Sequence, residues 1–136
     1  MINVKNIFKN FDKTTILNGI TASFVKGKTN LIIGQSGSGK TVLLKCLLGL
    51  HTPEKGKIYF GSDSLTDMNN KQRRMLRQEM GIVFQGSALF DSMNVEENIM
   101  FPMRMFTNKN DDELLHRANE VIKRVNLTNS NSKMPS

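Results

Sequence analysis

The sequence predicts an α/β fold that opens with a small antiparallel sheet. Apolar residues alternate with polar ones at Ile2 and Val4 and again over residues 20–24, and a polar turn at residues 12–14 separates the two runs. A third apolar run, residues 31–33, leads into a glycine-rich loop and then into an amphipathic stretch. Alternation with a period of two is typical of strands, whereas apolar residues spaced by three or four positions indicate a helix. The predicted order is therefore antiparallel hairpin, buried strand, loop and helix.

Further elements are expected along the rest of the chain. The helix after the loop carries four leucines between residues 43 and 48 and is expected to end at Gly49. The last helix begins where Asn110 and Glu113 have the spacing of a capping box. Between these two helices we expect a strand, a helix and a second buried strand, at residues 57–60, 69–80 and 82–84.

Composition limits the classes of protein that the chain can represent. It has 136 residues, 38% of them hydrophobic and 23% charged, which is room for one packed domain. The single cysteine, Cys46, excludes an internal disulfide, and no leader or long apolar stretch is visible, so we expect a cytosolic chain. The net charge of +7 favours an anionic partner, for which nucleic acid, acidic lipid headgroups and nucleotide phosphates all qualify.

One motif carries specific chemistry. The loop has the Walker A pattern of a glycine, four residues, then Gly-Lys-Thr, and reads Gly34-Gln35-Ser36-Gly37-Ser38-Gly39-Lys40-Thr41. Glycines let successive backbone N–H groups approach an anion, and the following helix adds the positive end of its dipole. Lys40 is then expected to reach the β- and γ-phosphates, and the Thr41 hydroxyl to ligate Mg²⁺. The motif predicts nucleotide binding through Gly34, Ser36, Gly37, Ser38, Gly39, Lys40 and Thr41.

Two further positions and one segment complete a family resemblance. Phe11 lies ahead of the loop in Lys9-Asn10-Phe11-Asp12, and Gln85 ends the apolar run 81–84. With the loop, they resemble the ATP-binding-cassette (ABC) transporter ATPases. Residues 84–102 are similar to the phospholipid-transport branch of that family, the ATPases of the maintenance-of-lipid-asymmetry systems.

The resemblance implies a fold, site roles and partners. The fold is an α/β P-loop NTPase of the ABC ATPase type with an N-terminal antiparallel β subdomain. Phe11 would stack on the adenine of ATP, and Lys40 and Gln85 would act in catalysis, with Gln85 near Mg²⁺. Residues 1–92 would form the β subdomain and the core to the Q-loop, and residues 93–136 would start the helical subdomain.

The same resemblance implies that the chain works at a membrane. Its partners would be an ABC permease, a second ATPase subunit and an MCE-domain lipid-binding protein, and no nucleic acid is expected. The location would be cytoplasmic, peripheral to the inner face of the cell membrane. Met93, Met100, Met103 and Met105 would then suit either the core or a docking groove for the permease.

Several parts of the family pattern do not occur in the sequence. They are the Ser-Gly-Gly signature, the apolar strand ending in Asp-Glu (Walker B) and the switch histidine. Asp91, His51 and His116 do not follow an apolar strand that could place them in these roles. The resemblance therefore implies a partial cassette, truncated before the signature, with an incomplete core sheet. With no general base visible, such a chain would bind ATP with negligible turnover.

Two other functions remain open on sequence grounds. A Walker A loop also occurs in other P-loop nucleotidases and kinases. A basic helix is also present, and its cations could bind nucleic acid or lipid headgroups, although a solvated helix face without interleaved aromatics is favoured. These cations are Lys71, Arg73, Arg74 and Arg77.

Overall fold

The computed structural model describes residues 1–84, 86 and 88–135. The chain divides into two compact units, Met1–Met80 and Gly81–Ser136. The assignment of residues 1–92 to the β subdomain and core, and of residues 93–136 to the helical subdomain, stays a prediction.

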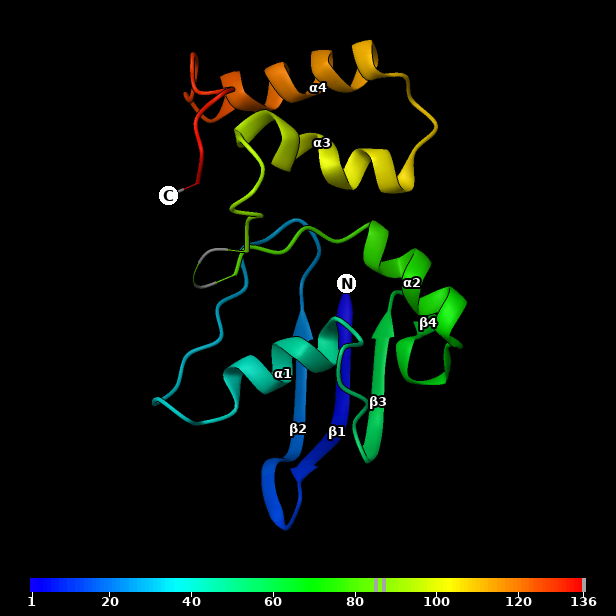
Figure 1. Cartoon of the computed structure of the whole chain (residues 1–136). Coiled ribbons are helices and arrows are strands. Elements are labelled where there is room, and N and C mark those ends of the chain that lie inside the picture. The colour runs from blue at the N-terminus through cyan, green and yellow to red at the C-terminus, as the bar shows by residue number, and fades with distance from the viewer. Residues whose placement is uncertain (85, 87, 136) are drawn as a thin grey trace. The chain divides into compact units, whose positions relative to one another are not determined.

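The first unit is built on a four-stranded antiparallel sheet in the order β2-β1-β3-β4 (Figure 1). Its strands are β1 (Ile2–Phe11), β2 (Thr14–Phe24), β3 (Lys55–Phe60) and β4 (Asp63–Ser64). The predicted hairpin and the predicted strand at 57–60 are therefore confirmed. The hairpin turns at Asp12, whose φ of 52° lies in the left-handed region that Asp tolerates better than most residues.

The β1–β3 pairing is irregular where a bulge interrupts it. The register shifts between Lys5 and Phe8, and Asn6 has a φ of 52°. On the facing strand β3, Gly56 has a φ of 92°, and a Cβ there would lie 2.3 Å from the Asn6 carbonyl oxygen. Only glycine fits such an approach of two backbones.

One helix covers a face of this sheet. Helix α1 (Lys40–Leu47) crosses the strands in Figure 1. It buries Leu43, Cys46 and Leu47 against Val4, Ile7, Leu17, Ile58 and Leu65, which together form the core. The helix ends as predicted, because Gly49 follows with a φ of 65°, the left-handed conformation typical of a helix C-terminus.

The basic stretch forms helix α2 (Asn70–Gln78), which follows a 3₁₀ turn, η1 (Leu65–Asp67). The sequence favoured a solvated helix face, but two of its four cations are bonded within the unit. Arg73 donates to the Thr52 hydroxyl and to the Thr66 carbonyl, each at 3.1 Å, and Arg77 donates to the Gly49 carbonyl at 3.4 Å. These two arginines bind loop backbone within the unit, so only Lys71 and Arg74 remain as exposed cations of that stretch.

Two predicted strands do not form. Residues 31–33 and 82–84 have no regular structure, and Leu31, Ile33 and Val83 are 82%, 81% and 99% exposed. Apolar runs of this kind suit strands of a parallel sheet, which are covered on both faces and bonded on both edges. Among the residues that the structure describes, neither run pairs with another strand. The expectation of two buried strands is therefore wrong, while an incomplete core sheet is what the chain has.

The second unit is a helical hairpin of α3 (Val95–Phe106) and α4 (Asp111–Arg124). Both helices start at capping boxes, Asn94 with Glu97 and Asn110 with Glu113, and the second of these is as predicted. Leu114 and Ala118 of α4 pack on α3 in a small apolar core.

The four methionines take different positions in this unit. Met100 is 5% exposed and Met103 packs against it, so both serve as core residues. Met93 is half-buried, and Met105 is 57% exposed. Core filling therefore describes two of the four.

The polar run at residues 126–135 folds back on the start of α3. The Lys133 carbonyl accepts from the Val95 amide at 2.9 Å, and the Asn131 carbonyl accepts from the Glu96 amide at 3.1 Å. The first amides of a helix have no partner within it, so these bonds satisfy two of them. The run is thus part of the second unit.

We expect Gly56→Ala to lower the free energy of unfolding by at least about 3 kcal/mol for two reasons. The new methyl group would collide with the backbone, and the fold would hold alanine at a left-handed φ. Gly61 offers a matched control, since its φ is 62° but nothing lies within 4 Å of its added Cβ. Gly61→Ala should cost about 1 kcal/mol. Urea unfolding followed by circular dichroism measures both, and equal losses would contradict the role given to the close approach at Gly56.

Candidate functional site

The glycine-rich loop joins β2 to α1 and is tied down at its start. Asn30 accepts from the Val25 amide at 3.0 Å and donates to the carbonyls of Val25 and Lys28 at 3.0 and 2.9 Å. These bonds form a local turn that fixes the exit from β2. Residues 34–38 beyond it are exposed, so their polar groups are open to a ligand.

One glycine of the motif is required by the geometry of the loop. Gly39 is buried with a φ of 89°, and a Cβ there would lie 2.9 Å from Leu17 and 3.2 Å from the Ile16 carbonyl oxygen. Any side chain at this position would displace the loop from the sheet. A Cβ on Gly34 would lie 2.7 Å from the Ser38 hydroxyl, which would have to rotate away.

The Lys40 side chain lies inside the curve of the loop. Its Nζ atom donates to the carbonyl oxygens of Gly34 and Gln35, each at 2.7 Å. Lys40 is also the first residue of α1, whose opening amides have no acceptor within the helix. An ammonium group and free helix N–H groups thus lie together, an arrangement that attracts phosphate oxygens.

The remaining motif residues lie on the exposed loop and on the start of α1. Ser36 and Ser38 are exposed on the loop, and the Ser38 amide donates to the Gln35 carbonyl at 3.2 Å. Thr41 is exposed on the first turn of α1. Their contact with a nucleotide stays a prediction.

Magnesium fits the donor set of this loop. Among the described residues, no group of three or more His, Cys, Asp or Glu could hold a metal. Mg²⁺ commonly takes one or two protein oxygens and completes its shell with phosphate and water, so the Thr41 hydroxyl is a suitable ligand. Gln85, the other predicted ligand, lies outside the described residues, and its role stays a prediction.

Phe11, the predicted adenine contact, lies at the end of β1, and the residue is 41% exposed. The ring meets His51 in an edge-to-face arrangement, with centroids 5.2 Å apart and an interplanar angle of 75°. The Lys9 ammonium lies 5.3 Å from the centroid of Phe11. Phe11 is therefore a supported ring with open surface, which suits stacking against a planar base.

Lys9 is fixed in turn by the turn before β3. Its Nζ donates to Glu54 Oε1 at 2.6 Å and to the Thr52 carbonyl at 3.0 Å, and the Asn10 amide donates to Glu54 Oε2 at 2.9 Å. The hydrogen bond from Lys9 is the main cause that holds the pKa of Glu54 below its ordinary value. The carboxylate thus stays ionised and keeps the end of β1 against this turn.

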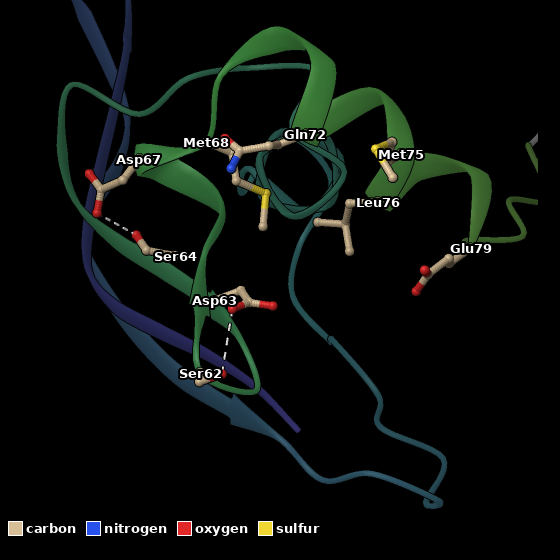
Figure 2. Close-up of a pocket in the computed structure, with 9 residues that line it drawn as sticks. All are labelled: Ser62, Asp63, Ser64, Asp67, Met68, Gln72, Met75, Leu76 and Glu79. Carbon is tan, nitrogen blue, oxygen red and sulfur yellow. Dashed lines mark hydrogen bonds between the residues drawn. The ribbon is translucent and has the colours of Figure 1, made fainter.

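A separate hollow of about 530 Å³ lies between β4, η1 and α2 (Figure 2). Three carboxylates line it, those of Asp63, Asp67 and Glu79. Lys57 bonds Asp67 and is the main cause of the lowered pKa of that group, while Ser64 donates to it at 2.7 Å. Anionic walls repel phosphate, so this hollow is unsuited to a nucleotide.

The other residues considered from the sequence take ordinary positions. Cys46 is fully buried, and burial raises the pKa of its thiol, so it packs as a small apolar group. Asp91 lies in an exposed turn rather than at the end of a strand. His116 has an 80% exposed side chain on α4, 3.6 Å from Glu120.

Comparison with known proteins places the chain in a family. A model of the ABC transporter family matches residues 17–136, which is most of the sequence. The chain belongs to the ABC transporter family. One relative is the methionine import ATP-binding protein MetN of Clostridium tetani, 35% identical over 99% of this chain and 42% of its own length. Another is the probable ribonucleotide transport ATP-binding protein mkl of Mycobacterium leprae, 34% identical over 98% of this chain and 39% of its own length.

This ABC transporter chain also shares the fold of solved cassettes. A dimeric structure of the ATP-binding cassette MJ0796 in a post-hydrolysis state superposes with a TM-score of 0.88 at 24% identity, over 99% of this chain and 62% of that one. A second dimeric structure of MJ0796 gives 0.86 at 25% identity, over 97% and 60%. The predicted P-loop ABC ATPase fold is thereby confirmed. The chain spans about two fifths of the length of the two curated relatives described above.

No helix within residues 1–84, 86 and 88–135 combines the length and the apolar character needed to cross a membrane.

Sequence reasoning did not identify the residues that support Phe11. Lys9 could have been found, because residues two apart along a strand point to the same face. His51 lies 40 positions from Phe11 in sequence, and no local pattern links them. Only the folding of the turn after α1 against the end of β1 brings the two rings together.

Glu54→Gln is expected to lower the free energy of unfolding at pH 7 by less than about 1 kcal/mol, since the pair with Lys9 is partly exposed. A carboxylate with a lowered pKa in the folded state stabilises the fold above its ordinary pKa and loses that contribution as the pH falls through the lowered value. Between about pH 7 and about pH 3 the difference between wild type and variant should therefore stay constant down to the ordinary glutamate pKa of 4.5 and shrink below it. Urea titrations across this range test the effect, and a difference independent of pH would contradict it.

Proposed function

We propose that this chain is the nucleotide-binding part of an ABC transporter ATP-binding subunit and that it binds MgATP at the loop 34–41. The observation that carries the proposal is the position of the Lys40 ammonium, inside the loop and at the start of α1. The family match over residues 17–136 supports it. A post-hydrolysis cassette of the same fold holds ADP and phosphate, and the curated relatives are named as ATP-binding proteins.

Each residue of the loop has a task in this proposal. Lys40 exchanges its two carbonyl acceptors for oxygens of the β- and γ-phosphates, which as anions form stronger hydrogen bonds with an ammonium group. The amides of the loop and of the first turn of α1 donate to the same phosphates. Thr41 and Gln85 hold Mg²⁺, which when bound neutralises charge between the phosphates. Phe11 stacks on adenine.

The transporter requires partners that this chain would contact. We propose an ABC permease and a second ATPase subunit, with the chain on the cytoplasmic side and peripheral to the membrane through the permease. Dimeric structures of the cassette MJ0796 support the pairing of two ATPase subunits. In this arrangement a second subunit completes each ATP site.

For the cargo we propose phospholipid, with an MCE-domain protein as a further partner. The support is the similarity of residues 84–102 to the phospholipid-transport branch. The curated relatives are named for methionine import and ribonucleotide transport, so general likeness to them does not indicate a cargo. The proposal on cargo therefore depends on that one segment.

Lys40→Ala should weaken MgATP binding at least tenfold, about 1.4 kcal/mol, because it removes the cation from the loop. Lys45→Ala is the matched control, since it removes the same charge from an exposed position later in the same helix. Isothermal titration calorimetry measures both affinities. Phosphate release by the wild-type chain should stay at background.

Two results would contradict these expectations. Equal MgATP affinity in the Lys40 and Lys45 variants would remove the basis for the site. Steady phosphate release by the wild-type chain that is abolished by Lys40→Ala would disprove negligible turnover.

Because residues 1–136 alone are expected to turn over ATP negligibly, the cargo is tested in cells in which the gene that contains this sequence is deleted and then restored at full length, as wild type or with Lys40→Ala. Transfer of a fluorescent phospholipid across the cell envelope should recover with wild type alone, because coupling to the permease requires ATP at Lys40. Uptake of labelled methionine in the same cells should be unaffected by the deletion. Methionine uptake that depends on the chain, with unchanged phospholipid transfer, would overturn the proposed cargo.

A further inference from the structure

The support of the Phe11 ring comes from two directions. His51 meets the ring edge-to-face, with 5.2 Å between centroids, and the Lys9 ammonium lies 5.3 Å from the centroid of Phe11. A phenylalanine ring has no hydrogen-bonding group that could fix its orientation, so its rotamer is restricted by contacts with neighbours such as these two. The residue as a whole is 41% exposed, so part of Phe11 remains accessible to a ligand.

Of these two neighbours, Lys9 is held rigidly by protein groups. Its side chain is 13% exposed and is bonded to Glu54 at 2.6 Å and to the Thr52 carbonyl at 3.0 Å. The cation is therefore engaged within the fold. It stabilises one side of the ring and does not serve as a free charge for a phosphate.

His51 is placed by the helix that begins at the phosphate loop. Its amide donates to the Lys45 carbonyl at 3.2 Å, and Leu50 does the same at 2.9 Å, so the chain leaving α1 is bonded to the last turn of that helix. Lys40 stands at the first residue of α1, and His51 follows its last turn. The rigid helix thus connects the loop that would receive the phosphates with the residue that locates Phe11.

We propose that His51 is a positioning residue for the nucleobase: through its edge-to-face contact it holds the Phe11 ring in the orientation that stacks on adenine. The proposal rests on the proposed function, because it assumes MgATP at the loop 34–41. His51 itself does not touch the nucleotide. Its loss frees the ring, and binding of the base must then restrict a mobile side chain.

The test separates the base from the phosphates. His51→Ala is expected to weaken MgATP binding roughly 2- to 10-fold, the range that corresponds to one aromatic edge-to-face contact. Binding of inorganic tripolyphosphate with Mg²⁺ should not change, because it contacts the loop and not Phe11. His51→Phe should restore most of the MgATP affinity, since a second aromatic ring can take the same place. His116→Ala is the matched control and should alter neither ligand, because His116 is exposed on α4.

Competition titrations with a fluorescent ATP analogue give both dissociation constants. Equal weakening of MgATP and tripolyphosphate in His51→Ala would overturn the inference, because it would indicate a general disturbance of the fold. Unchanged affinity for both ligands would overturn it as well. If wild type binds MgATP no more tightly than tripolyphosphate, stacking of the base on Phe11 is wrong, whereas phosphate binding at the loop 34–41 stands. If wild type binds neither ligand, the proposed function itself fails.

Discussion

The close approach of Gly39 to β2 is the constraint on which the rest of the first unit depends. With no Cβ, this buried residue lies against Ile16 and Leu17, where any side chain would collide. The contact fixes the start of α1 at the sheet. It therefore places Lys40 within the loop and, at the same time, directs Leu43 and Leu47 into the core. The geometry of the glycine-rich loop and the packing of the core therefore have one common origin.

The far end of α1 is fixed by different means. Arg73 of α2 donates to the Thr52 hydroxyl and the Thr66 carbonyl, and Arg77 donates to the Gly49 carbonyl, so guanidinium groups hold the segments on either side of β3 and β4. A cation near the C-terminus of α1 is also favourable to the helix dipole. The turn at residues 51–54 is bonded from one side by Arg73 and from the other by Lys9 and Asn10. Phe11 and His51 meet at this well-anchored turn.

Much of the fold was predictable because its signals are local. The hairpin follows from alternation at Ile2 and Val4, the Walker A loop from its spacing, and the last helix from the capping box at Asn110. Each signal depends on residues within a few positions of one another. Two of the three strand pairs, β1 with β2 and β3 with β4, join neighbours in sequence, whereas β3 pairs with β1 across β2 and α1.

The failures of prediction all concern partners distant in sequence. Residues 31–33 and 82–84 have the composition of buried strands, but burial requires a neighbouring strand and a covering layer, and the described residues provide neither. The basic helix looked like a solvated face, whereas the fold turns Arg73 and Arg77 inward to loop backbone. The contact of Phe11 with His51 could likewise not be predicted from any local stretch of sequence, because the two residues lie 40 positions apart.

The polar run at the C-terminus has a consequence for how the second unit comes apart. Carbonyls of Asn131 and Lys133 satisfy the opening amides of α3, and the Asn131 side chain donates to both Glu96 and Asn119. One asparagine thereby joins the first turn of α3 to the middle of α4. Release of residues 131–133 would therefore remove hydrogen bonds from that turn as well, so this polar segment contributes to the local stability of the helical hairpin.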